Sequence, residues 1–176
     1  MKKFGRIAVA ALVFGFFGCS DKALTSKSQA GPEQVLKKFT AFESKNGIKN
    51  WTLIAQEAKI YESHKNAQLK DFLVNFFTDD GKQIKAVLKA QLGEIDTDKN
   101  DFYTKGPTTI TSADNTVLQS TDLRYKSDTK KIYGDSYVKL IKSDGIVEGK
   151  GIEAEPDLSS VIIKESMAHA TSEGSK

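Results

Sequence analysis

Hydrophobic and polar residues alternate in short runs between residues 35 and 165, a pattern typical of β-strands with one buried and one solvated face. The alternation is clearest over residues 84–92, where lysine and glutamine residues separate the hydrophobic positions. After Trp51 the hydrophobic residues change from odd to even positions, which predicts a β-bulge near residues 56–57. Because no convincing helical pattern accompanies these runs, the predicted fold class is all-β.

Turn-forming residue pairs recur 30 to 34 residues apart and divide the same region into similar units. The pairs are Asn46-Gly47, Asp80-Gly81, Asp114-Asn115 and Asp144-Gly145. Each unit is expected to hold a pair of strands, and such a repeat predicts stacked strand pairs. We therefore expect residues 35–165 to form an open antiparallel β-jelly roll, a folded sheet of repeated strand pairs whose inner faces enclose one hydrophobic seam.

This hydrophobic seam is the candidate binding surface of the chain. By sequence alone it is either the solid core of a sandwich or a groove for a hydrophobic ligand. The small side chains of Ala55, Ala86 and Ala90 favour a groove, because they leave space between the sheets. The seam is expected to contain Leu53, Phe72, Val74, Phe76, Ile84, Leu88, Leu92, Leu118, Leu123, Val138 and Leu140.

The two outer strands of such a sheet leave unpaired backbone donors and acceptors, which natural proteins either protect or use. The first strand is expected near residues 38–43 and the last over residues 158–164, where few charged residues guard the edge. These edges are therefore candidate surfaces for other chains. The residues assigned to partner edges are Phe39, Phe42, Gly134, Val161, Ile162 and Ile163.

The first residues have the order of a bacterial secretory signal, with a short basic segment followed by an uncharged hydrophobic stretch that ends at Gly18. Residues 1–18 are thus expected to be a signal peptide, too short for a permanent membrane span. The following Cys19 resembles the cysteine of a lipobox, before which the chain is cut and which is then acylated, so we expect it to be a lipid anchor. A plain thiol is the alternative. Residues 19–34 are small and polar and predict a flexible tether, and residues 166–176 predict a disordered tail.

Charge and side-chain chemistry exclude several classes of function. Loss of the signal segment would leave 23 basic against 23 acidic residues, so no basic surface for nucleic acid is expected. His64 and His169 lie in polar segments, and Asp79-Asp80 is more simply a turn than a metal site, so no catalytic group, metal or cofactor is predicted. Six lysines either are solvent-exposed and protect the strand edges from pairing, or contact phosphate groups at the mouth of a groove. They are Lys37, Lys38, Lys82, Lys85, Lys130 and Lys131.

Several short motifs together resemble the LptC family, whose fold is shared by the LptA and OstA proteins. The resemblance covers nearly all of residues 39–165. It is carried by Trp51-Thr52-Leu53-Ile54-Ala55 with Ala58 and Tyr61, Phe76-Phe77 before Asp80-Gly81, Leu123-Arg124-Tyr125, Tyr133-Gly134 and Gly149-Lys150-Gly151.

This resemblance implies a periplasmic carrier in lipopolysaccharide export. Such a carrier receives lipopolysaccharide from an inner-membrane ABC transporter of the LptB/LptF/LptG type, holds the acyl chains between the sheets, and passes the lipid to an LptA-type bridge protein. The resemblance also implies strand pairing at both edges, with the transporter at the first and the bridge protein at the last. Familiar members have a transmembrane helix, whereas Cys19 would anchor this chain to a membrane, most simply the inner one.

Two other functions stay open at this point. The chain could be an envelope lipoprotein that binds another amphiphile, or one with a solid β core and a structural role. Ser20 follows Cys19 without the aspartate that retains lipoproteins at the inner membrane, and Asp21 comes one place later, so the sequence leaves the membrane open.

Overall fold

The computed structural model describes residues 31–170, with residues 167–170 described by their backbone only. This part of the chain forms one ten-stranded antiparallel sheet with the order β1-β2-β3-β4-β5-β6-β8-β9-β10, in which β7 pairs with both β5 and β8. A short 3₁₀ turn, η1 (Glu62–His64), follows the second strand. The strands are β1 (Gln34–Lys45), β2 (Ile48–Tyr61), β3 (Asn66–Phe77), β4 (Ile84–Asp96), β5 (Asp101–Ser112), β6 (Val117–Ser120), β7 (Arg124–Lys126), β8 (Lys131–Lys142), β9 (Gly145–Ala154) and β10 (Val161–Ala170).

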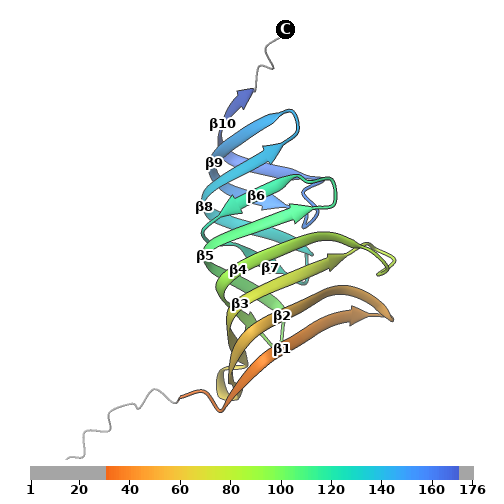
Figure 1. Cartoon of the computed structure of the whole chain (residues 1–176), viewed down its shortest axis with the longest axis vertical. Coiled ribbons are helices and arrows are strands. Elements are labelled where there is room, and N and C mark those ends of the chain that lie inside the picture. Colours follow the sequence, from red (N-terminus) through yellow and green to blue (C-terminus); the bar gives the residue numbers. More distant parts are fainter. Residues whose placement is uncertain (1–30, 171–176) are drawn as a thin grey trace, which may run out of the picture. The chain divides into compact units, whose positions relative to one another are not determined.

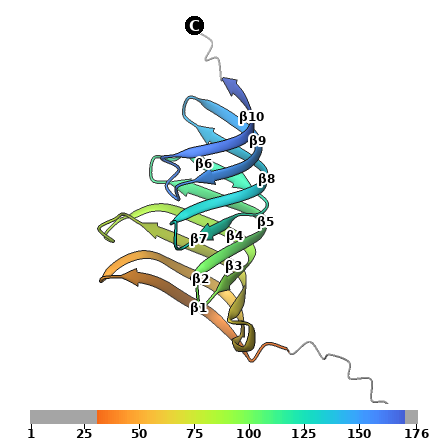
Figure 2. The same ribbon diagram turned by 180° about the vertical axis from the view of Figure 1, so that it is seen from behind.

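The predicted turn pairs all lie between consecutive paired strands, so the repeat of strand pairs is confirmed. They connect β1 to β2, β3 to β4, β5 to β6 and β8 to β9. In the first turn Asn46 and Gly47 have φ values of 53° and 78°, the left-handed conformation that tight hairpins need. Figures 1 and 2 show the strands stacked from β1 at one end to β10 at the other, with the hairpin turns projecting from the stack.

The long strands bend along a common line, which we call the fold line, and the sheet folds back on itself there (Figure 1). Left-handed residues mark this line in several strands: Lys38 in β1, Asp71 in β3, Gly106 in β5 and Gly151 in β9. The first half-sheet carries the four predicted turns and includes residues 39–55, 72–90, 108–120 and 137–149. The second half-sheet includes residues 34–37, 57–70, 92–105, 123–134 and 151–163. Their inner faces enclose the core.

The hydrophobic phase changes at the fold line, as predicted for β2, but the predicted β-bulge near residues 56–57 is wrong. Leu53 and Ala55 are buried on one side of the line and Ala58 on the other. The registers of β1 with β2 and of β2 with β3 nevertheless continue unshifted across this point. The neighbouring strands bend together, so no extra residue is needed. At the fold line the register shifts only at residues 90–92 of β4 against β5 and at residues 134–137 of β8 against β9.

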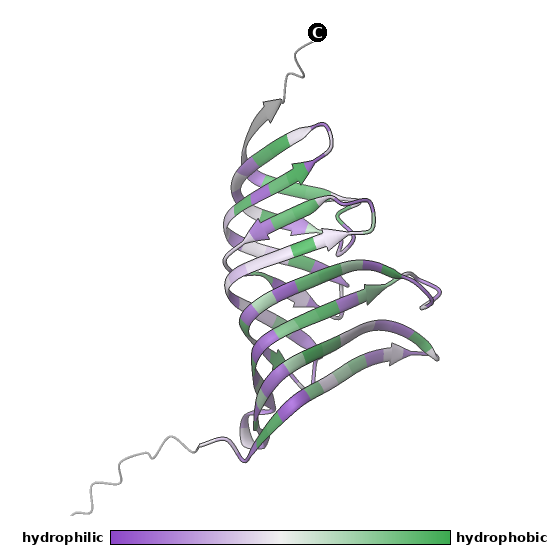
Figure 3. Cartoon of the chain, in the orientation of Figure 1, coloured by the Kyte–Doolittle hydropathy of each residue, from purple (hydrophilic) through white to green (hydrophobic). Residues whose placement is uncertain are grey.

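Strands β1 and β10 are the two edges of the sheet, as expected, although the last strand differs in its bounds. Leu158 lies in the turn before β10 with φ 60°, so the strand begins at Val161. It continues to Ala170, past the residue at which the domain was expected to end. Figure 3 shows hydrophobic and hydrophilic residues alternating along the strands, as a sheet with one buried face requires.

Gly93 lies on the inner face of β4 where the two half-sheets approach each other closely. A Cβ atom there would lie 2.4 Å from the Tyr103 carbonyl oxygen and 2.7 Å from the Phe72 ring. The missing side chain therefore makes room for the Phe72 ring.

Candidate lipid-binding groove

Four aromatic side chains fill the N-terminal part of the seam. Trp51 and Phe76 come from the first half-sheet, whereas Phe102 and Tyr125 come from the second. The Phe102 and Tyr125 rings stack with centroids 4.7 Å apart, Phe76 lies 5.3 Å from Tyr125, and Trp51 meets Phe102 edge-on at 6.0 Å. We call these four residues the aromatic cluster. Because it joins the two half-sheets and all its members are buried, this part of the seam is solid core.

Burial of the aromatic cluster affects the polar atoms it contains. Burial, and to a smaller degree the nearby carboxylates of Glu43 and Asp101, raises the pKa of Tyr125 far above its ordinary value. Trp51 Nε1 is buried and has no hydrogen-bond partner in the described structure. If the two half-sheets moved apart here, the Tyr125 hydroxyl and Trp51 Nε1 would gain contact with water or with a bound molecule.

Most residues of the predicted seam lie on the inner face, as expected, and their contact with lipid stays a prediction. Leu53, Phe72, Val74, Phe76, Leu88, Leu118, Leu123, Val138 and Leu140 are buried in the core.

Two seam predictions are wrong. Leu92 is 51% exposed, because the fold line lies between Ala90 and Gly93 and turns this side chain to the outer face. Ile84 is 47% exposed, because it begins β4 beyond a register shift, beside the turn. The alternation of hydrophobic and polar residues thus predicts the buried face correctly on either side of the fold line, but not where a strand bends or ends.

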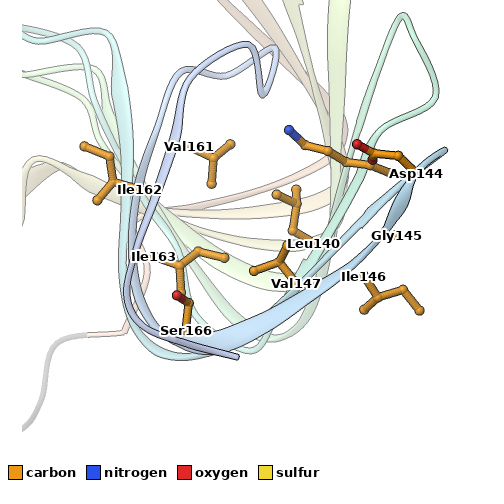
Figure 4. A pocket seen from close by; sticks show the side chains of 10 residues that line it. Leu140, Asp144, Gly145, Ile146, Val147, Val161, Ile162, Ile163 and Ser166 are labelled. Carbon is orange, nitrogen blue, oxygen red and sulfur yellow. The ribbon is translucent and has the colours of Figure 1, made fainter. Parts of the chain in front are cut away.

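The seam opens into a cavity at its C-terminal end, with a volume of about 620 Å³. Leu140 of β8, Val147 of β9 and Val161 and Ile163 of β10 point into one space in Figure 4. Lys142 and Asp144 also line this space, near the turn between β8 and β9. A hydrophobic cavity of this size, with few polar groups at its rim, can hold a hydrocarbon chain or a similar small ligand. We call it the C-terminal cavity.

The exposed edges carry hydrophobic side chains, as the sequence predicted. Phe42 of β1 is 66% exposed and Ile162 of β10 is 57% exposed, whereas Phe39, Val161 and Ile163 are half-buried against the core. Each of these residues lies in a strand with a single neighbour. Such strands can accept another strand by main-chain hydrogen bonding.

Gly134 does not lie at an edge, so this assignment is wrong. It is buried in β8, which pairs with β7 on one side and β9 on the other. A Cβ atom there would lie 3.0 Å from both the Asp122 carbonyl oxygen and the Leu123 side chain. The glycine allows close packing inside the sheet.

Of the six lysines considered for phosphate contact, four have partners within the protein. Lys37 pairs with Glu57, Lys131 pairs with Glu153 at 2.6 Å, and Lys85 pairs with Asp157 at 3.6 Å. Lys130 donates to the Asn50 side chain at 3.3 Å, while Lys38 and Lys82 are exposed. The six come from distant parts of the sheet and do not form one cluster.

The sequence interpretation missed two members of the aromatic cluster and part of the C-terminal cavity. Tyr125 follows Leu123 at the spacing of a strand face, so its burial could have been predicted, and Phe102 and Val147 lie in hydrophobic runs. The pattern does not tell which strand of one half-sheet faces which strand of the other. Cys19 and the signal segment lie outside the described residues.

Within residues 31–170, no helix is long and apolar enough to cross a membrane. The described side chains also contain no group of three or more histidine, cysteine, aspartate or glutamate residues that could hold a metal ion.

Comparison with known proteins gives a family and a fold. The family model described as lipopolysaccharide-assembly, LptC-related, matches residues 7–168. Among solved structures, the chain is similar to LptH, the LptA homologous periplasmic component of the conserved lipopolysaccharide transport device from Pseudomonas aeruginosa. The match has 17% sequence identity and a TM-score of 0.50, and it covers 65% of this chain and 82% of LptH. This likeness confirms the β-jelly roll fold. No curated protein matches the chain.

Proposed function

We propose that this chain, which belongs to the LptC-related family of lipopolysaccharide-assembly proteins, is a carrier that holds the acyl chains of lipopolysaccharide between its two half-sheets. Membership places the chain in lipopolysaccharide transport, and the family and its fold are those of transport proteins. The observation that carries the proposal is the C-terminal cavity, because the aliphatic part of its lining continues the inner face of the sheet to the edge strand β10.

The proposal includes a direction of transport from one edge of the sheet to the other. In this proposal the chain receives lipopolysaccharide from an inner-membrane ABC transporter of the LptB/LptF/LptG type at the β1 edge. It passes the lipid to an LptA-type bridge protein at the β10 edge. The exposed Phe42 and Ile162 support strand addition at both edges, since a partner strand would cover them while pairing with the backbone.

Attachment to the membrane completes the proposal. Cys19, acylated after removal of the signal peptide, would hold the protein at the periplasmic face of the inner membrane, and residues 19–34 would link it to the sheet. Acyl chains contribute about 0.8 kcal/mol per buried methylene, so two or more chains would anchor the protein stably. Labelling with a radioactive fatty acid tests this point, and a Cys19→Ser protein that is labelled equally would contradict it.

One observation favours a second function. The aromatic cluster fills the N-terminal part of the seam, and a structural lipoprotein with a solid β core would be packed in this way. In that case the C-terminal cavity would bind another amphiphile or serve only as a docking surface.

Photocrosslinking in cells separates the two functions. A photoreactive amino acid at Val147, inside the C-terminal cavity, is expected to form adducts detected by antibodies to lipopolysaccharide. The same amino acid at Gln119, exposed on strand β6, which β8 separates from β9, is the control and is expected to form none. A folded, abundant protein without adducts at Val147 would favour the structural lipoprotein.

A further inference from the structure

Polar side chains connect the two half-sheets across the open side of the fold, opposite the fold line. At the N-terminal end, the Ser127 hydroxyl, between β7 and β8, donates to the Glu43 carboxylate of β1. Lys130 of the same turn donates to Asn50 of β2 at 3.3 Å. These contacts join the first two strands of one half-sheet to a turn of the other. They lie beside the aromatic cluster, since Asn50 precedes Trp51 and Glu43 pairs with Trp51 across the strands.

A second connection lies further along the mouth. Lys85 of β4 is 3.6 Å from Asp157, which belongs to the turn between β9 and β10. The two side chains are 24% and 28% exposed, so solvent reaches them. Ser159 donates to Asp157 through both its hydroxyl and its backbone N–H, and these bonds hold the carboxylate in place. We call the Glu43–Ser127, Asn50–Lys130 and Lys85–Asp157 contacts the mouth contacts.

The mouth contacts and the fold line have opposite mechanical properties. The fold line is continuous backbone, and the registers of β1 through β3 cross it without a shift, so it is a permanent joint. The mouth contacts are side-chain pairs that water can replace, and solvent-accessible pairs of this kind are weak. A rotation of the half-sheets about the fold line would separate the mouth contacts first and would then expose the aromatic cluster.

We propose that the N-terminal part of the seam is a latent acyl-chain site, closed by the mouth contacts, which opens about the fold line when lipid enters from the β1 edge on its way to the C-terminal cavity. This inference rests on the proposed function and adds a regulated step to it. In the closed state only the C-terminal cavity is available to hydrocarbon. In the open state Leu88 and the aromatic cluster line a continuous groove, and hydrocarbon replaces the contacts that the half-sheets lose. A short cavity thus becomes long enough for a lipid with several chains.

Trp51 makes the opening directly measurable, because it is the only tryptophan in the sequence and is fully buried in the cluster. Purified protein is titrated with lipopolysaccharide while quenching of tryptophan fluorescence by acrylamide is recorded. We expect the quenching constant to change as lipid binds. A maltoside detergent with a single chain, which the C-terminal cavity can hold by itself, is expected to leave Trp51 unchanged.

A pair of variants tests the mouth contacts themselves. Asp157→Asn combined with Ser127→Ala removes two of them, and we expect acrylamide quenching of Trp51 without lipid to rise about threefold to fivefold, the factor that loss of exposed pairs produces in a two-state equilibrium. Lipopolysaccharide adducts from a photoreactive residue at Leu88 are expected to rise by a similar factor. The matched control is Glu94→Gln, which removes the Lys105–Glu94 pair of the second half-sheet, away from the mouth.

The outcomes separate this inference from the proposed function. Adducts at Val147 with no change at Trp51 on lipid binding would overturn the latent site and leave the carrier function in place. No adducts at Val147 and no change at Trp51 would overturn both. An equal rise in quenching for Glu94→Gln would show general loosening of the sheet and would also overturn the role of the mouth contacts. The titration of the unmodified protein decides the matter even where the double variant fails to fold.

Discussion

The two ends of the seam have the same backbone architecture but opposite packing. Where β2 and β3 face β5 and β7, large aromatic rings from both half-sheets meet and leave no room. Where β8 and β9 face β10, branched aliphatic side chains surround a cavity. The fold alone therefore does not decide whether the space between the half-sheets is a core or a groove. The size of the side chains on the facing strands decides whether that space is filled or open.

The largest expected difference between the two ends is in stability. Phe102→Ala removes a ring that contacts three other aromatic residues, and it should lower the free energy of unfolding by about 3–5 kcal/mol. Val147→Ala, at the open end, should cost about 1 kcal/mol or less, because its side chain is only half-buried. Urea unfolding followed by circular dichroism measures both. Equal losses for the two variants would mean that the ends are packed alike.

The closed end also depends on a missing side chain. Gly93→Ala would force a methyl group against the Tyr103 carbonyl and the Phe72 ring, and we expect a loss of about 1–3 kcal/mol from overpacking. The control is Gly31→Ala, where an added Cβ meets nothing within 4 Å. Thermal unfolding of both proteins checks this, and a Gly93→Ala protein as stable as the control would show that strand β5 and the Phe72 ring shift readily to admit a methyl group.

The open end should affect binding more than stability. Val147→Asp places a charge in the C-terminal cavity and is expected to weaken lipopolysaccharide binding about tenfold, since an unpaired charge is poorly accommodated beside hydrocarbon. Binding is measured by displacement of a fluorescent lipid. Gln119→Asp adds the same charge on the outer face and serves as control. Similar affinities for the two variants would remove the cavity from the binding site.

The smallest effect is the pH dependence of the closed end. The pKa of Tyr125 is raised in the folded protein, so burial of the neutral phenol stabilises the fold fully below pH about 10, where a tyrosine in the unfolded chain ionises. Above that pH the stabilisation is lost, by about 1.4 kcal/mol for each further pH unit. Unfolding of the wild type and of Tyr125→Phe between pH 9 and about 11 measures the difference. Parallel pH profiles would contradict the burial of this group.

The sequence predicted the strand pairs well because they depend on local chemistry. Asn46-Gly47 adopts a tight turn by itself, and alternation assigns Leu53, Val74 and Leu88 to the inner face without knowledge of the rest of the fold. The edges followed from the same reasoning, since a stack of strand pairs must begin and end somewhere.

The contacts between half-sheets could not be predicted in this way. Phe102 and Trp51 are far apart in sequence and on different half-sheets, and their contact depends on the angle of the fold and the twist of the sheet. Leu92 was assigned to the wrong face because a period of two does not show where a strand bends. Gly134 was placed at an edge because a glycine at an exposed edge and one inside a packed sheet look alike in a sequence.

Neighbour-to-neighbour pairing has a consequence for how the protein folds. From β1 to β5 each strand pairs with the next one in the chain, so each hairpin closes over a short loop and can add to the strands already formed. Export of the unfolded chain, which the predicted signal peptide would direct, would bring β1 out first, and the sheet could form in that order. The edge strand β10 would be added last. The C-terminal cavity, which needs β10 as a wall, would then be the final part of the molecule to form.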